Sequence, residues 1–171
     1  MKEFSEYFGN IIKISQPSIF KRFHEIRAGE DFLGSLQQKG FFGMLWEVKL
    51  FNKACDIYRS SCWKCKLEIR EVGYEMPFAD FQRSGFKSKG VLNLPKGEKL
   101  TIEPHLFKGF CEIKNLQEES LIKIKLKTGF GDKGEITFIK KADLIDKYPW
   151  VVILGYIIAL EQRHRAANSA V

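Results

Sequence analysis

The stretch that decides the fold is Tyr148-Pro-Trp-Val-Val-Ile-Leu-Gly-Tyr-Ile-Ile-Ala-Leu160, an apolar run of 13 residues near the end of the chain. As an α-helix it would be about 20 Å long. The hydrocarbon core of a bilayer is about 30 Å thick and needs roughly 20 apolar residues. Glu161, Arg163 and Arg165 follow at once and cannot extend the run. A membrane tail anchor therefore fits this length poorly, and we predict no transmembrane span.

The same run predicts a buried helix at positions 148–165. Pro149 suits the first turn of a helix, where its missing N–H costs nothing. Asp143 and Asp146 lie just upstream, where negative charge complements the positive end of the helix dipole. Between the ends there is no polar stripe at any helical angle. Because a helix that is apolar all round must be surrounded all round, we expect positions 148–160 to be buried on every side.

The preceding residues predict strands. In three segments apolar and charged residues alternate, which is typical of half-buried antiparallel strands. These segments are residues 62–71, residues 99–103 and residues 119–128. Weaker runs cover residues 11–15, 19–26, 31–37, 43–51, 54–58, 76–83, 87–94, 110–116 and 134–140. Turn signals such as Pro95-Lys96-Gly97 separate them, and we expect no helix before position 142.

About twelve short strands around one apolar helix indicate a mainly β fold, a closed antiparallel barrel with the C-terminal helix at its centre. Eight strands already nearly fill a barrel with their own side chains, so twelve leave a lumen that the helix can occupy. We expect residues 1–171 to form a single domain, with the strands at about 11–140.

The order of several segments resembles the tubby C-terminal-like superfamily, in particular its small prokaryotic and LURP-one-related members. The segments that carry the resemblance are Gln16-Pro17-Ser18, Leu33-Gly34-Ser35-Leu36, Trp46, Trp63-Lys64, residues 67–72, Gly90-Val91-Leu92-Asn93-Leu94, Pro95-Lys96-Gly97 and Pro149-Trp150-Val151-Val152-Ile153-Leu154-Gly155-Tyr156. The resemblance implies a twelve-stranded barrel around a C-terminal helix. Tubby domains bind phosphoinositides, and phospholipid scramblases share the fold. No residue here matches the phosphoinositide site, so none is carried over.

Motifs for catalysis, metals or cofactors are weak in this sequence. Cys62-x-x-Cys65 has no second pair to complete a zinc site, because Cys55 and Cys111 are isolated. We expect Cys65 to be a core residue. Residues 129–134 satisfy Gly-x-Gly-x-x-Gly, but they predict a hairpin turn without the helix that would hold a pyrophosphate. The three histidines show no ligand spacing. We therefore expect no metal, no cofactor and no enzyme activity.

The composition favours an anionic partner, because the chain has a net charge of +7 and a pI near 9.2. Two strands carry cations on their outward positions, where they could meet lipid headgroups. These are Lys123, Lys125 and Lys127 on one strand and Lys64, Lys66 and Arg70 on another. The alternative interpretation is that these lysines are the solvated outside of a barrel. The N-terminus lacks the apolar core of a signal peptide, so we expect a cytoplasmic protein, able to lie at the inner membrane surface.

These observations favour a non-enzymatic binding or scaffold module of tubby-like type, with anionic lipid as its ligand. Two alternatives stay open. One is a protein–protein adaptor that uses Phe41, Phe42 and Phe107 as anchors. The other is a small-molecule-binding protein or enzyme with a cleft at the barrel mouth. Nucleic acid is a less favoured partner, because most aromatic residues occupy positions predicted to point inward.

Overall fold

The computed structural model describes residues 3–40, 45–60, 66–84 and 89–169, and these residues form a closed barrel of twelve strands. Each strand pairs antiparallel with the next one in the chain, and β12 pairs with β1 to close the ring. The strands are β1 (Ile12–Ser15), β2 (Phe23–Ala28), β3 (Asp31–Lys39), β4 (Leu45–Leu50), β5 (Lys53–Arg59), β6 (Lys66–Glu71), β7 (Pro77–Arg83), β8 (Gly90–Asn93), β9 (Lys99–His105), β10 (Phe110–Lys114), β11 (Ser120–Lys127) and β12 (Lys133–Phe138). The predicted fold class is confirmed.

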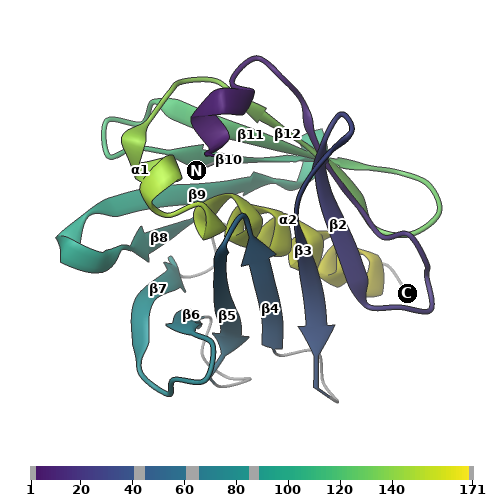
Figure 1. Cartoon of the computed structure of the whole chain (residues 1–171), viewed down its shortest axis with the longest axis horizontal. Coiled ribbons are helices and arrows are strands. Elements are labelled where there is room, and N and C mark those ends of the chain that lie inside the picture. The colour runs from purple at the N-terminus through teal and green to yellow at the C-terminus, as the bar shows by residue number, and fades with distance from the viewer. Residues whose placement is uncertain (1–2, 41–44, 61–65, 85–88, 170–171) are drawn as a thin grey trace.

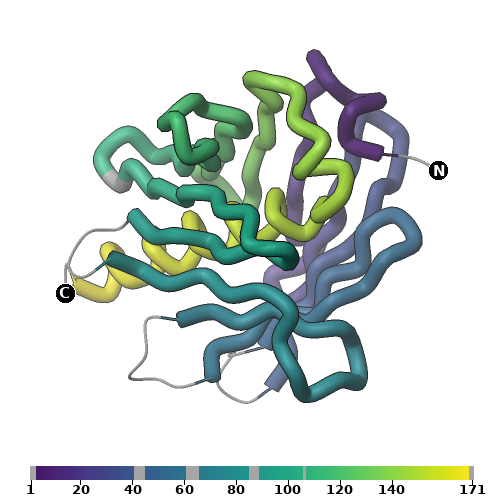
Figure 2. The backbone as a smooth tube through the Cα atoms, turned by 90° about the vertical axis from the view of Figure 1, so that its left-hand side faces the viewer, coloured from purple at the N-terminus to yellow at the C-terminus, as the bar shows by residue number. Residues whose placement is uncertain are grey.

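The helix α2 (Trp150–Asn168) runs through the inside of this ring (Figures 1 and 2). Every residue of α2 from Trp150 to Leu160 is buried. Tyr148 is only half-buried, so the expectation of burial on every side is wrong at that position. Its ring lies beside Trp150 where the chain enters the barrel, and its hydroxyl donates a hydrogen bond to the Pro95 carbonyl at 3.4 Å.

The helix is also longer and starts later than predicted. A separate short helix, α1 (Asp143–Lys147), precedes it, and Pro149 is the N-cap residue of α2. Beyond Leu160 the helix continues to Asn168 instead of ending at position 165, with an increasingly exposed surface. Three short 3-10 helices, η1 (Phe4–Tyr7), η2 (Pro95–Gly97) and η3 (Leu106–Lys108), correct the expectation that no helix occurs before position 142.

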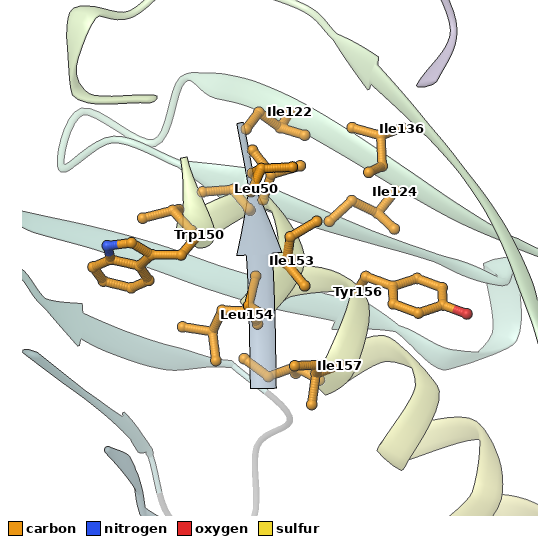
Figure 3. Packing of buried hydrophobic residues seen from close by; sticks show 14 of the residues in the cluster. Leu50, Ile122, Ile124, Ile136, Trp150, Ile153, Leu154, Tyr156 and Ile157 are labelled. Carbon is orange, nitrogen blue, oxygen red and sulfur yellow. The ribbon is translucent and has the colours of Figure 1, made fainter. Parts of the chain in front are cut away.

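The strand alternation places apolar side chains against α2 and charged side chains outside. On β11, Ile122 and Ile124 are fully buried, whereas Lys125, the next residue along the strand, is exposed. On β6, Leu67 and Ile69 are buried in the same way. Figure 3 shows the isoleucines of β11 and β12 meeting the side chains of α2. The inward and outward assignments made from the sequence are confirmed for these residues, whereas Cys62, Trp63, Lys64 and Cys65 lie outside the described residues.

A glycine in the middle of α2 allows the helix to approach one side of the barrel closely. A Cβ atom added at Gly155 would lie 2.6 Å from Cδ1 of Ile124 and 2.9 Å from Cδ1 of Ile113. Atoms that close must move apart, so a larger residue would push α2 away from β10 and β11. The position of the helix in the ring is therefore fixed by steric fit as well as by hydrophobic burial.

The barrel has two ends, which we name after the residue of α2 that lies at each. At the Trp150 end, α1 and η1 lie together, and the Ser5 amide donates a hydrogen bond to Asp146 at 2.9 Å. At the Glu161 end, Arg59 from β5 forms an ion pair with Glu161 at 2.5 Å. The loops at residues 16–22, 106–109 and 128–132 lie at the Glu161 end, because the strands that they connect are antiparallel.

Candidate functional site

The two predicted cation stripes lie on different sides of the barrel. Lys123, Lys125 and Lys127 project from β11, and Lys66 and Arg70 project from β6. In the closed ring β11 is separated from β6 by β10, β9, β8 and β7 in one direction and by six strands in the other. The two stripes therefore cannot contact one flat lipid surface together. Lys64, the remaining predicted site residue, lies outside the described residues.

Most cations in these stripes are already partnered by carboxylates or aromatic rings. Lys127 pairs with Glu135 at 2.7 Å, and Lys66 pairs with Glu68 at 2.9 Å. The hydrogen bond from Lys66 lowers the pKa of Glu68 and raises the pKa of Lys66. Lys123 lies over the Phe110 ring, and Arg70 lies over the Tyr58 ring and 3.4 Å from Asp56. This arrangement favours the interpretation that the stripes are the solvated outside of a barrel.

A different feature gathers at the Glu161 end, where three loops each expose a phenylalanine. Phe20 and Phe130 are 92% and 81% exposed, and Phe107 is fully exposed. The loops join β1 to β2, β11 to β12 and β9 to β10. Since the ring runs in the order β2, β1, β12, β11, β10, β9, these loops are consecutive around the rim. We call Phe20, Phe107 and Phe130 the rim phenylalanines.

Contacts between the loops support this placement. The Gln16 amide donates a hydrogen bond to the Asp132 carbonyl at 3.0 Å, and the Asp132 amide donates to the Gln16 side chain at 3.2 Å. In Figure 1 the loop after β1 and the loop between β11 and β12 both lie at the right, near the C-terminal part of α2. Single exposed apolar residues need no explanation, but three exposed phenylalanines on consecutive loops mark this rim as a candidate interaction surface.

Exposed lysines accompany the rim phenylalanines. Lys21 and Lys108 directly follow Phe20 and Phe107, and Lys133 lies three positions after Phe130. The carboxylate nearest to them in the chain, Asp132, is already engaged by Arg163 at 2.7 Å. The loops at the opposite end carry acidic residues, among them Glu30, Glu75, Glu118 and Glu119. The Glu161 end therefore combines exposed phenylalanines with exposed lysines on three consecutive loops.

The sequence interpretation missed Phe20, because residues 19–26 were assigned to one strand. The β1–β2 ladder ends at the pair Ser15 and Glu25, and β2 begins only at Phe23. Phe20 therefore lies in the connecting loop beyond the sheet. The Phe-Lys pairs next to turns were the available signal. Phe107 was expected to be exposed, which is confirmed, and Phe41 and Phe42 lie outside the described residues.

The Trp150 end has a cleft of about 640 Å³ beside the start of α2. Its walls are mostly apolar and include Leu50, Phe78 and Trp150, with Lys53 and Lys147 at its border. Cys55 lies at this wall, and burial raises the pKa of its thiol to about 12. The cleft supports the alternative of a small-molecule-binding protein, because the helix fills the lumen but leaves the cleft at the Trp150 end open.

The part of the chain that the structure describes holds no group of three or more His, Cys, Asp or Glu side chains placed to bind a metal ion. It also contains no helix of the length and hydropathy that crossing a bilayer requires. Residues 129–134 lead into β12 as a hairpin connection, as predicted.

Comparisons of the chain with protein-family models, with curated proteins and with solved structures returned no match. The resemblance to the tubby-like superfamily therefore stays a hypothesis. What the structure defines is a class of architecture, a closed antiparallel β-barrel with a central C-terminal helix.

Proposed function

We propose that this protein is a non-enzymatic module that binds anionic membrane surfaces through the Glu161 end of its barrel. The observation that carries the proposal is the gathering of the rim phenylalanines, each accompanied by a lysine, on three consecutive loops. Aromatic side chains enter the boundary between headgroups and acyl chains, while lysines remain among the headgroups. This proposal keeps the lipid partner expected from the sequence but moves the contact from the strand faces to the loop tips.

The magnitudes of both contributions are sufficient for reversible binding. Complete burial of a Phe side chain contributes roughly 1.5–3 kcal/mol, and a loop tip that enters the interface recovers part of this. Each lysine near an anionic leaflet adds about 1 kcal/mol, and this share declines as salt screens the charge. Three phenylalanines and three lysines acting together would give weak to moderate affinity that depends on both the anionic lipid and the salt concentration.

The test is sedimentation of the protein with phosphatidylcholine vesicles that contain or lack phosphatidylglycerol, over a series of salt concentrations. We expect binding only with phosphatidylglycerol, and weaker binding as salt rises. The triple variant Phe20→Ser/Phe107→Ser/Phe130→Ser should lose binding. Tyr74→Ser is the matched control, because Tyr74 is 66% exposed on a loop at the opposite end.

A second comparison separates the loop tips from the strand faces. Lys21→Gln/Lys108→Gln/Lys133→Gln should weaken vesicle binding, whereas Lys123→Gln/Lys125→Gln on β11 should leave it unchanged. Absence of binding to anionic vesicles at low salt would overturn the proposal. In that case the rim phenylalanines would be better explained as anchors for a protein partner.

The cleft at the Trp150 end favours a second candidate function, the binding of a small amphipathic anion. Its apolar walls suit an alkyl chain, and Lys53 at the border suits a carboxylate. Brominated dodecanoate should quench the fluorescence of Trp150, which lines the cleft. Ala54→Trp would fill the cleft from β5 and should weaken the interaction with dodecanoate, measured by calorimetry. Equal affinity for both proteins would exclude this cleft as the site.

A further inference from the structure

The inner wall of the barrel changes from apolar to polar at the Glu161 end. On β1 the inward residues Ile12 and Ile14 are followed two positions later by Gln16. On β2 the inward residue Ile26 is preceded by His24 and then by Arg22. Gln16 and Arg22 lie just beyond the ends of β1 and β2, and together with His24 they line a polar space beyond the apolar core.

A polar cavity of about 190 Å³ lies among these side chains and the last buried turn of α2. The residues that line it come from three strands, two loops and the helix. They include Arg22, His24, Gln38, Trp46, Asp132 and His164. Residues far apart in the chain thus meet at one place, because β12 closes the ring against β1.

His24 is the most unusual of these side chains, because it is 1% exposed and neither ring nitrogen has a hydrogen-bond partner within the described part of the chain. Its ring lies between Trp46 and Tyr156, each with a ring centroid 5.9 Å away. Burial lowers the pKa of His24, while the charge of Asp132 and the nearby Leu36 backbone, which does not reach normal hydrogen-bond geometry with the ring, oppose that shift. A buried polar group without a partner calls for a ligand or a bound water.

Tyr156 adds a second group of the same kind. Its hydroxyl is fully buried and has no hydrogen-bond partner within the described residues. In Figure 3 the hydroxyl points away from the other labelled side chains of α2. Burial raises the pKa of Tyr156, and the charge of Asp132 adds to this. The hydroxyl therefore stays protonated and able to donate a hydrogen bond.

The charges around the cavity leave a cation in excess. Asp132 is paired with Arg163 at 2.7 Å and also lies 3.4 Å from Nε2 of His164, and Glu161 is paired with Arg59 at 2.5 Å. Arg22 donates a long hydrogen bond of 3.5 Å to the Gly40 carbonyl and has no ion-pair partner among the residues described. Both carboxylates at the cavity thus have arginine partners, while Arg22 retains an uncompensated charge.

We propose that this cavity binds a phosphate group. The group would be held by Arg22 from the loop before β2, by His24 from β2 and by His164 from α2. Donors that converge from a strand and from a helix suit the several oxygens of a phosphate better than the two oxygens of a carboxylate. The fork of an arginine guanidinium matches phosphate geometry. A bound phosphate would give the buried ring of His24 the partner that it lacks.

The phosphate can come from two sources, a soluble phosphate compound or the headgroup of a lipid. The inference goes beyond the proposed membrane contact, because the cavity lies inside the rim and its residues are not those of the loop tips. It therefore survives or fails independently of the vesicle experiment.

The experiment is isothermal titration calorimetry of the full chain with three probes: inorganic phosphate, glycerol 3-phosphate and dihexanoyl phosphatidic acid kept below its micelle concentration. We expect at least one probe to bind. Arg22→Gln and His164→Gln should each weaken binding by about tenfold to 100-fold, as expected for the loss of a charge-assisted hydrogen bond. Arg27→Gln is the matched control, because Arg27 lies on β2 with its side chain outside the barrel, where it pairs with Glu25.

The pattern of binding identifies the source of the phosphate. Binding of inorganic phosphate or glycerol 3-phosphate indicates a soluble ligand, and binding of the short-chain lipid alone indicates a headgroup. The long-range ¹H–¹⁵N NMR signals of the His24 ring should shift on addition of the probe that binds. His24→Gln should also weaken binding of that probe. Should this variant fail to fold, Arg22→Gln still decides the matter, because Arg22 is exposed and its loss leaves the core intact.

Two results would overturn the inference. One is the absence of heat and of NMR shifts with all three probes, which would leave bound water as the partner of His24. The other is binding that Arg22→Gln and His164→Gln do not change. The triple variant of the rim phenylalanines should bind the soluble probes normally, so loss of membrane contact and loss of the phosphate site are distinguishable.

Discussion

The central helix offers the sharpest quantitative prediction. Ile153 and Ile157 are both fully buried on α2, one helical turn apart. The ring around them is closed by hydrogen bonds between every neighbouring pair of strands, so the wall cannot easily collapse into a cavity. Replacement of a buried isoleucine by alanine costs 2–5 kcal/mol, and the cost is greatest where the site cannot relax. We expect Ile153→Ala and Ile157→Ala each to fall in the upper half of that range.

The measurement is urea unfolding followed by far-UV circular dichroism. A domain of this size has a typical free energy of unfolding of about 5–15 kcal/mol, so either variant removes a large share of it. The double variant should differ from the sum of the two, because side chains in contact are not independent. Ala167→Ser is the control, since Ala167 is exposed near the end of the same helix and should change stability by less than about 0.5 kcal/mol.

A charge at the same position gives a stronger test. Ile157→Asp would place a carboxylate at a fully buried position of α2, and we expect an insoluble or unfolded chain. A soluble variant that unfolds cooperatively at nearly the original urea concentration would refute the reasoning. Losses below about 1 kcal/mol for both alanine variants would do the same, because the helix would then be an appendage to a barrel that is stable without it.

Two further predictions concern titratable groups. In a Cys62→Ser/Cys65→Ser variant, the remaining thiols of Cys55 and Cys111 should react with Ellman's reagent at least about a hundredfold more slowly in the native protein than in urea. The reason is that burial raises the pKa of both thiols. Fast reaction of both thiols in the native protein would contradict their burial. The free energy of unfolding should fall as the pH drops below about 6.5, because His24 binds a proton in the unfolded chain more readily than in the folded one. Asp132, Glu161, His164 and Arg22 line the same cavity as His24, and Tyr156 packs against its ring. All of these groups remain in a His24→Gln variant, which should show a flatter pH profile in phosphate-free buffer. Identical profiles for the two proteins would show that His24 does not carry this dependence.

The side chains that form the core of this protein could be predicted from local patterns in the sequence. An apolar run without a polar stripe is stable in water only when it is buried on all sides. The alternation of apolar and charged residues along the strands indicates which side chains face that run. Both are local patterns, so they could be interpreted without knowing how the strands pair. The inward positions of Ile122, Ile124, Leu67 and Ile69 were predicted correctly for this reason. Strand ends were predicted less well, because the last pair of a ladder depends on the partner strand.

Which surface groups lie close together follows only from the tertiary structure. Closure of the ring through β1 and β12 brings the loop of Phe20 beside the loop of Phe130, and it places Asp132 near His24. The same closure separates the stripe on β11 from the stripe on β6, although the sequence makes the two look equivalent. Ion pairs such as Arg59 with Glu161 join residues that no local pattern relates. Burial of the apolar run follows from its own composition, whereas a surface site depends on distances between distant segments, and only the folded ring sets those distances.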